Sequence, residues 1–313
     1  MERLSKYVLI IGLLISQGVG YGQNCTQDST TIRFDAATWM KFLPDSILIT
    51  DLSIPGSHNS CTYNTSQSFS KCQTQTLDAQ LKYGVRYLDL RFVYRNGTLV
   101  MYHGYDNLRI TFEQCLETVK TFLNEHPSET VLLRLQREKK GGKETDEMYF
   151  DAIVSAFEKT GLPLIDTSDS ISLKLGNLRG KALVVEYNCM QQNARTFPHI
   201  TGYSYWGYLT SADQVEAKWK DILKKEISEV NYQKFNRINL YSSGGRKILG
   251  ITVPNPKSFT KLLIENKLND IIEFISNSPQ NYIIITDFEE LFLKEPGAFY
   301  QLIIEKNFKP NKN

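Results

Sequence analysis

Two histidines stand where predicted strands end. His58 lies in the segment IPGSHNS at 54–60, after a Pro-Gly pair that interrupts a short apolar run. His103 ends the strand-like run TLVMYH and precedes Gly104, a residue type that permits a sharp turn. The carboxyl ends of strands are where α/β folds hold their reactive groups. Both imidazoles are therefore candidates for proton transfer.

An acid and a guanidinium lie between these histidines in the sequence. Asp89 and Arg91 belong to the strand-like run VRYLDLRF at 85–92, and the two-residue period of a strand places both side chains on one face. Such a set suits phosphoryl transfer, because one histidine can accept a proton, the other can donate one, and the arginine can hold the anion. Each histidine alone is more often structural, so the pairing carries the prediction.

These segments resemble the X domain of phosphatidylinositol-specific phospholipase C, chiefly its small secreted bacterial form. The resemblance rests on IPGSHNS at 54–60, LDLR at 88–91, YHG at 102–104, PSET at 127–130, LRGK at 178–181, SSGG at 242–245 and ITDF at 285–288. It covers most of the chain from about Trp39 onward. The order and spacing of the segments make it specific, rather than any one of them.

The resemblance implies metal-free cleavage of a phosphodiester, a phosphatidylinositol diacylglycerol-lyase activity. His58 would take the proton of the inositol 2-hydroxyl, which attacks phosphorus to give a cyclic phosphate, and His103 would protonate the departing diacylglycerol oxygen. Arg91 would hold the phosphate, Asp287 would orient the base, and Asp89 would support the phosphate site and the acid. No cofactor and no catalytic metal are expected, because Arg91 stands where calcium-dependent relatives carry an acid.

Five further positions are expected to bind substrate, and most depart from the metal-free bacterial pattern. Asn59 replaces an aspartate and matches calcium users, Gln136 with neighbouring Arg137 replaces a lysine, and Tyr187 replaces an arginine. Asp213 matches loosely the aspartate that contacts inositol hydroxyls. The loss of two cationic contacts leaves the headgroup open between phosphatidylinositol and a glycosylated form of it.

The composition is that of a globular chain without a strong charge bias. The 313 residues carry 36 Lys and Arg against 34 Asp and Glu, which gives no reason to expect nucleic-acid binding. Residues 1–22 have a charged start, an apolar core and small residues at their end, the pattern of a secretory signal. We therefore expect a leader at 1–22 and a secreted, periplasmic or cell-surface monomer at 23–313.

Strand-like and helix-like segments alternate along the rest of the chain, with no Pro/Gly/Ser-rich linker. Strands are expected near 85–92, 98–102, 130–135, 182–187, 238–241 and 282–287, and helices near 35–42, 77–83, 111–125, 146–159, 212–230, 258–276 and 296–305. This alternation favours a parallel sheet closed by crossover helices. We predict an α/β fold with a single irregular TIM-type barrel.

The cysteines and two loops leave alternatives open. Cys61 and Cys72 can form a disulfide beside the His58 turn or stay as buried thiols, and neither has zinc-like spacing. The charged loop at 136–143 can contact substrate or lie solvated. The aromatic segment at 188–209 can rest on lipid headgroups, in transient contact with the membrane that holds the phospholipid substrate, or pack over the barrel mouth.

Two other functions compete with this prediction. One is a metal-dependent phosphodiesterase of the glycerophosphodiester or sphingomyelinase D type, which needs grouped carboxylates. The other is a phospholipid headgroup-binding protein on the same fold without catalysis, which the residues at Asn59, Gln136 and Tyr187 motivate.

Overall fold

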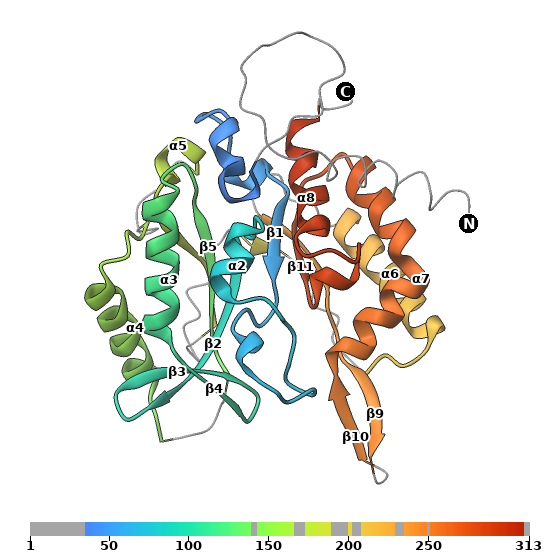
Figure 1. The fold of residues 1–313 in the computed structure, drawn as a ribbon, viewed down its shortest axis with the longest axis horizontal. Coiled ribbons are helices and arrows are strands. Elements are labelled where there is room, and N and C mark those ends of the chain that lie inside the picture. Colours follow the sequence, from blue (N-terminus) through green and yellow to red (C-terminus); the bar gives the residue numbers. More distant parts are fainter. Residues whose placement is uncertain are drawn as a thin grey trace. The chain divides into compact units, whose positions relative to one another are not determined.

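Seven parallel strands follow one another around a curled sheet in a computed structural model of the chain (Figure 1). The model describes residues 35–138, 143–165, 173–188, 200–201, 208–228, 235–248 and 251–309. The strands are, in their order across the sheet, β7 (Ile200–Thr201), β8 (Phe235–Leu240), β11 (Ile283–Thr286), β1 (Ile54–Ser57), β2 (Tyr87–Arg95), β5 (Val131–Arg137) and β6 (Ala182–Asn188). Among the described residues no pairing joins β6 to β7, so the barrel is open there.

Two antiparallel additions extend this barrel. The outer half of β2 leaves the parallel ladder and pairs with β3 (Thr98–His103), which pairs in turn with β4 (Asp106–Thr111). Asn96 and Gly97 both have positive φ at the β2–β3 turn, as hairpin turns of this length require. A separate ribbon is formed by β9 (Gly244–Ile248) and β10 (Ile251–Asn255). Neither β4 nor this ribbon was predicted.

Helices cover the outside of the strands and agree closely with the predicted segments. They are α2 (Leu77–Lys82), α3 (Phe112–Glu125), α4 (Asp146–Thr160), α5 (Leu175–Leu178), α6 (Ala212–Ser228), α7 (Pro256–Asn277) and α8 (Ala298–Glu305). Figure 1 shows α3 beside α4 and α6 beside α7, and both pairs are in contact. The expected helix at 35–42 is instead a 3-10 segment, Ala36–Phe42, with a kink at Thr38.

The predicted strand break at the Pro55-Gly56 pair is wrong, because both residues lie inside β1. Pro55 lacks an N–H for the ladder, yet its carbonyl accepts from the Arg86 amide at 2.9 Å. Gly56 is required by close packing, since a Cβ there would lie 3.1 Å from Ile285 and 3.2 Å from Tyr87. His58 therefore follows the strand directly, and its amide donates to the Thr286 carbonyl at 3.1 Å.

The barrel interior changes from apolar to polar along the strands. Alternate residues face inward, and the first layer is buried and apolar, with Ile54, Tyr87, Leu132, Phe235 and Ile283. The next layers toward the carboxyl ends hold the polar side chains His58, Asp89, Arg91, Arg134, Arg237, Asn239 and Asp287. Helix-facing residues form a second apolar core outside the sheet. The polar residues are thus gathered at one end of the barrel.

The residues from 34 to 313 form one compact unit. The expected leader at 1–22 lies outside the described residues, as do most of the aromatic segment and positions 139–142 of the charged loop. None of the helices in the described ranges combines the length and the hydrophobicity needed to cross a bilayer.

Candidate active site

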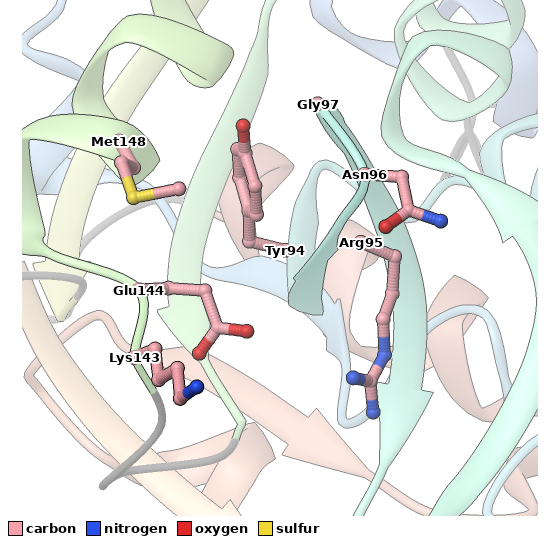
Figure 2. A pocket seen from close by; sticks show the side chains of 7 residues that line it. All are labelled: Tyr94, Arg95, Asn96, Gly97, Lys143, Glu144 and Met148. Carbon is pink, nitrogen blue, oxygen red and sulfur yellow. The ribbon is translucent and has the colours of Figure 1, made fainter.

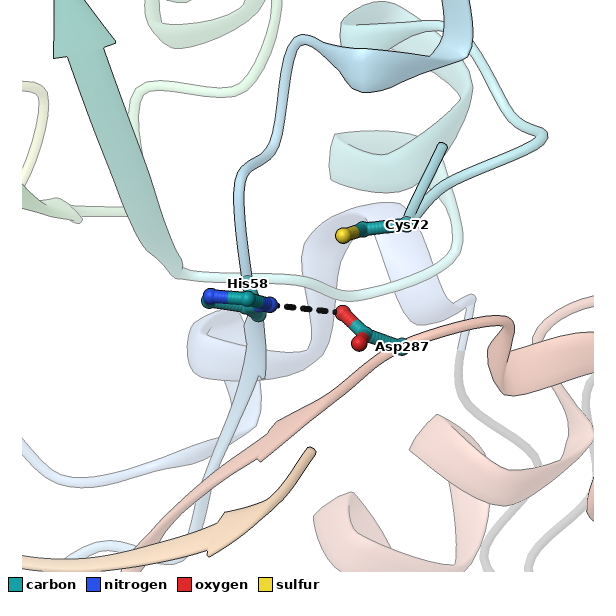
Figure 3. Close-up of side chains that lie close together, drawn as sticks. All are labelled: His58, Cys72 and Asp287. Atoms are coloured by element: carbon teal, nitrogen blue, oxygen red, sulfur yellow. Dashed lines mark hydrogen bonds and ion pairs between the residues drawn. The ribbon is translucent and has the colours of Figure 1, made fainter. Parts of the chain in front are cut away.

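His58 is held in one orientation by contacts to one ring face and to both ring nitrogens. Its Nδ1 lies 2.8 Å from Asp287 Oδ1 (Figure 3), and its ring stacks on Tyr241 with 3.6 Å between centroids. Burial raises the pKa of the Asp287 carboxyl well above its usual range, whereas the Cys72 thiol and Arg91 act in the opposite direction. With the carboxylate as the acceptor, Nδ1 carries the proton and Nε2 keeps its lone pair. The Asn59 amide nitrogen lies 3.1 Å from that Nε2. Burial holds the pKa of His58 well below its usual range, and Arg91 lowers it further, so the imidazole is a neutral base.

His103 approaches the same space from the end of β3. The two imidazole rings are 6.3 Å apart between centroids and nearly perpendicular. His103 Nδ1 donates to the Ser70 carbonyl at 2.6 Å, which leaves Nε2 to serve the reaction. Burial and Arg91 lower the pKa of His103, against the opposing effects of the Ser70 carbonyl and Glu138.

Asp89 is the charged centre between the two histidines. Its carboxylate accepts from Arg91 Nε at 3.0 Å and Nη2 at 2.8 Å, and from Arg134 Nη1 at 3.1 Å. It also accepts from the backbone N–H of Asn59 at 3.1 Å. Burial raises its pKa, but Arg134 and Arg91 outweigh burial and hold the pKa well below its usual range. Arg91 also lies 3.6 Å from Glu138. Asp89 therefore remains ionised and fixes the guanidinium of Arg91 beside the histidines.

A chain of ion pairs continues from Asp89 across the barrel. Arg134 lies opposite Asp89 in the register of β2 and β5 and donates through Nε to Glu186 at 2.9 Å. Glu186 also accepts from Arg237 Nη1 at 2.5 Å and from the Tyr87 hydroxyl at 3.3 Å. Sequence reasoning missed these residues, although Arg134 stands two positions before the predicted Gln136 and so shares its face of the strand.

The predicted substrate-binding residues fall into two groups. Asn59 contacts His58 and Asp89, and Gln136 pairs in register with Arg91 at the rim, so both belong to the site. Arg137 lies outside this cluster, because period-two alternation turns it toward Asp146 at 3.3 Å and over the Tyr149 ring.

Tyr187 and Asp213 also lie apart from the histidines. A register shift after Leu133 places Glu186 opposite Arg134, and this turns Tyr187 into the apolar core between the sheet and the helices. Tyr187 therefore lies away from the histidines, and a substrate contact there stays a prediction. Asp213 is exposed in the first turn of α6, and it makes no contact within the cluster that the described residues form.

Of the two alternatives for Cys61 and Cys72, a disulfide or buried thiols, the structure shows the second, since both are buried free thiols. The Cys61 sulfur lies 3.3 Å from that of Cys115 on α3. Cys72 instead lies beside the histidines, with its Sγ 3.9 Å from the Asn59 amide nitrogen and 4.0 Å from His103 Nδ1. Burial raises the pKa of the Cys72 thiol well above its usual range.

A surface pocket of about 380 Å³ lies outside this cluster (Figure 2). It is formed where the β2–β3 turn meets the segment before α4, and Tyr94, Arg95 and Glu144 are among its lining residues. None of the histidines lines it. The pocket therefore adds nothing to the site at the barrel mouth.

A segment of the chain matches a known protein family. The model of the family described as phosphatidylinositol-specific phospholipase C, X domain, matches residues 46–187. The matched segment is similar to that X domain and covers just under half of the 313 residues. It contains His58, Asp89, Arg91 and His103, whereas Asp287 lies beyond it, directly after the strand that pairs with β1.

Two curated relatives and a solved structure are similar to the chain. The 1-phosphatidylinositol phosphodiesterase of Listeria monocytogenes is 33% identical over 159 residues, 48% of each chain. That of Staphylococcus aureus is 28% identical over 143 residues, 44% of this chain and 43% of the relative. The chain thus aligns with about half the length of these curated relatives.

The structural similarity extends well past the X domain. The phosphatidylinositol-specific phospholipase C from Listeria monocytogenes superposes with a TM-score of 0.66 at 24% identity, over 88% of this chain and 99% of that one. The superposition therefore extends well beyond residues 46–187. The predicted irregular TIM-type barrel is confirmed.

Proposed function

We propose that this chain is a phosphatidylinositol-specific phospholipase C that cleaves the glycerol–phosphate bond without a metal. One observation carries the proposal: two imidazoles lie 6.3 Å apart, and the guanidinium of Arg91 is fixed beside them by Asp89. The names of the Listeria and Staphylococcus relatives, which specify phosphatidylinositol, support the choice of substrate.

In the proposed mechanism His58 begins the reaction as a general base. Its Nε2 takes the proton of the inositol 2-hydroxyl, and the resulting oxygen attacks phosphorus to form a cyclic phosphate. The imidazolium that forms is stabilised by Asp287, whose Oδ1 lies 2.8 Å from Nδ1. A neutral imidazole is needed for this step, and the lowered pKa of His58 provides it across the neutral range.

His103 and Arg91 act on the other side of phosphorus. His103 donates a proton to the diacylglycerol oxygen as the phosphorus–oxygen bond breaks. Its free-enzyme pKa is lowered by burial and by Arg91, and the negative phosphate opposes both effects once it binds. The Arg91 guanidinium pairs with the non-bridging oxygens as charge builds on them. Water can then open the cyclic phosphate by the same two groups in reversed roles.

The mechanism is tested with phosphatidylinositol vesicles and phosphorus NMR. We expect a cyclic inositol phosphate as first product, and a fall in rate of about 100-fold to 10,000-fold for His58→Ala and for His103→Ala. His126→Gln is the matched control, because His126 packs on Phe122 at the end of α3. Wild-type rates in either alanine variant would refute the mechanism.

The same assay separates the rival functions. A chelator leaves the rate unchanged under our proposal, whereas a metal-dependent phosphodiesterase loses activity. Vesicle binding without any cyclic phosphate would instead support the headgroup-binding protein. Comparison of phosphatidylinositol with a glycosylated form and with phosphatidylcholine identifies the headgroup, a choice on which Asn59, Gln136 and Asp213 bear as candidate substrate contacts.

We also propose a transient contact between the barrel mouth and the membrane. Tyr105 follows His103 on the β3–β4 turn and is 90% exposed, and Phe69, 40% exposed, precedes Ser70. Aromatic side chains suit the headgroup region. Export through removal of residues 1–22 belongs to this proposal, and N-terminal sequencing of protein recovered from the medium or the cell surface tests it.

A further inference from the structure

Three donor atoms of different chemistry converge on the Nδ1 side of His58, opposite the Nε2 that acts in the proposed mechanism. They are His58 Nδ1, Cys72 Sγ and a carboxylate oxygen of Asp287, and all lie within 4.8 Å of one another. Figure 3 shows the three side chains pointing toward a common space. All three residues are buried, with Cys72 and Asp287 fully so. The proposed mechanism uses the imidazole and the carboxylate, but it gives the thiol no task.

We propose that this cluster is a site for a borderline-soft divalent cation such as Zn²⁺, and that the bound cation holds the base in an inactive form. Thiolate, imidazole and carboxylate are the ligands that Zn²⁺ takes in proteins, whereas Ca²⁺ and Mg²⁺ prefer oxygen. One thiolate and one carboxylate balance the charge of the ion. A neutral complex of this kind is suited to a buried position, where an unbalanced charge is costly.

The spacing of the donors fits such an ion with small movements. Ligand bond lengths of about 2.0–2.3 Å in a tetrahedral complex separate the donor atoms by about 3.4–3.6 Å. The 2.8 Å between His58 Nδ1 and Asp287 Oδ1 must therefore widen slightly, and the thiol must move inward. Asp287 Oδ2 has no hydrogen-bond partner among the described residues, so the carboxylate has a second oxygen to offer.

The backbone around Cys72 keeps the thiol next to the other two donors. The Cys72 amide donates to the Thr62 hydroxyl at 3.0 Å, and its carbonyl accepts from the Phe288 amide at 2.8 Å. Phe288 is the neighbour of Asp287 in the chain, so the loop that carries the thiol is tied directly to the end of β11. Two of the three ligands are thereby held together before any ion binds.

Binding of the cation changes which nitrogen of His58 carries the proton. The cation takes the lone pair of Nδ1, the ring proton moves to Nε2, and the Cys72 thiol releases its proton to water. An Nε2–H can no longer accept a proton from a substrate hydroxyl. Asn59, whose Oδ1 has no hydrogen-bond partner in the described part of the chain, can turn its amide so that this oxygen accepts from Nε2–H. The bound cation thus stabilises the tautomer that cannot act as a base.

The test adds Co²⁺ or Zn²⁺ to the full chain and does not require activity. Co²⁺ bound by a thiolate gives a charge-transfer absorption in the near ultraviolet, which we expect in the wild type and not in Cys72→Ser. Cys115→Ser is the matched control, since this buried thiol lies on α3 and contacts Cys61 instead. Loss of an outer-shell partner alone weakens metal binding about 10-fold to 100-fold, so we expect Cys72→Ser to weaken Zn²⁺ binding at least about 100-fold.

Two results would overturn the inference. One is the absence of a thiolate band in folded wild-type protein, and the other is an equal band in Cys72→Ser, which would place the ion on another thiol. A nitrogen NMR spectrum adds an independent readout, because His58 should change from the Nδ1–H to the Nε2–H tautomer when Zn²⁺ binds. Circular dichroism establishes that each variant is folded.

The activity assay forms a separate arm. Zn²⁺ should lower kcat for phosphatidylinositol in the wild type and in Cys115→Ser, with recovery when a chelator is added. A chain that binds Co²⁺ through Cys72 but cleaves no lipid would uphold this inference and defeat the proposed function. Cleavage of phosphatidylinositol without a cobalt band would uphold the proposed function and defeat this inference.

Discussion

The pairing of His58 with Asp287 yields the sharpest prediction, which concerns the Asp287→Asn substitution. In the native site Asp287 accepts from Nδ1–H at 2.8 Å and leaves the Nε2 lone pair for the substrate. An asparagine amide can donate to Nδ1, so the proton is driven to Nε2. The side-chain nitrogen of Asn59 lies 3.1 Å from Nε2, and its Oδ1 has no partner among the described residues. The amide can therefore rotate so that Oδ1 accepts a hydrogen bond from Nε2–H. Both neighbours then favour the wrong tautomer.

The size of the effect follows from these contacts. A hydrogen bond to a charged group contributes about 1.5–3 kcal/mol, and an unfavourable donor in its place costs about the same again. The sum of about 3–6 kcal/mol corresponds to a fall in kcat of about 100-fold to 10,000-fold, since each 1.4 kcal/mol is about tenfold. KM should change little, because Asp287 is fully buried behind the imidazole and does not reach the substrate.

Initial rates on phosphatidylinositol vesicles measure this effect. Asp146→Asn is the control for the chemical change itself, since this carboxylate binds Arg137 on the outer face of the barrel. Thermal unfolding of both variants establishes that they are folded. An Asp287→Asn enzyme within about threefold of the wild-type kcat would contradict the argument, because the tautomer would then not be set by Asp287.

Three further predictions concern the phosphate, the fold and the membrane. Arg91→Lys should lower kcat about 100-fold in the vesicle assay, since an ammonium cannot reproduce the two contacts to Asp89 and hold phosphate as well. Burial raises the pKa of Glu289 from 4.5 to about 7. Between these two pH values the folded state binds more protons than the unfolded state, so the wild type loses about 3 kcal/mol of stability as the pH rises from 4.5 to 7. Glu289→Gln should flatten that dependence in urea unfolding at pH 4.5 and pH 7, and an unchanged slope would refute the assignment. Tyr105→Ala should weaken sedimentation with phosphatidylinositol vesicles, whereas Phe150→Ala, 43% exposed on α4, should not.

The sequence predicted most of the scaffold because the helices and parallel strands have clear periodicity. The α3 segment shows an apolar stripe and a Thr111–Gln114 capping box, so its start could be placed to within a residue. The alternation of strands with helices predicted the parallel sheet. The strand β4 and the β9–β10 ribbon were not predicted, since both are antiparallel additions that lie outside the alternation of helices and parallel strands.

The candidate site was also predicted only in part. His58, Asp89, Arg91, His103 and Asp287 converge as predicted, because residues at the carboxyl ends of neighbouring parallel strands meet at one edge. Whether these residues carry out catalysis stays a prediction.

Tyr187 could not be placed from the sequence, since one irregular step between β5 and β6 reverses which side chain faces inward. Arg134 and Glu186 were missed for the same reason: their pairing depends on the register of two strands that are far apart in the chain.

Strand β2 belongs both to the parallel barrel and to the antiparallel β2–β3 hairpin. This arrangement affects which part of the site can change in evolution. The first half of β2 carries Asp89 inside the barrel, whereas its second half pairs only with the hairpin strand that bears His103. The proposed proton donor, His103, thus lies on the hairpin, whereas the proposed proton acceptor, His58, directly follows barrel strand β1. Changes in hairpin length or twist can shift the leaving-group side of the reaction while the attacking side stays fixed. Exchange of residues 96–111 among members of the family should therefore alter preference for the departing alcohol and leave the choice of headgroup intact.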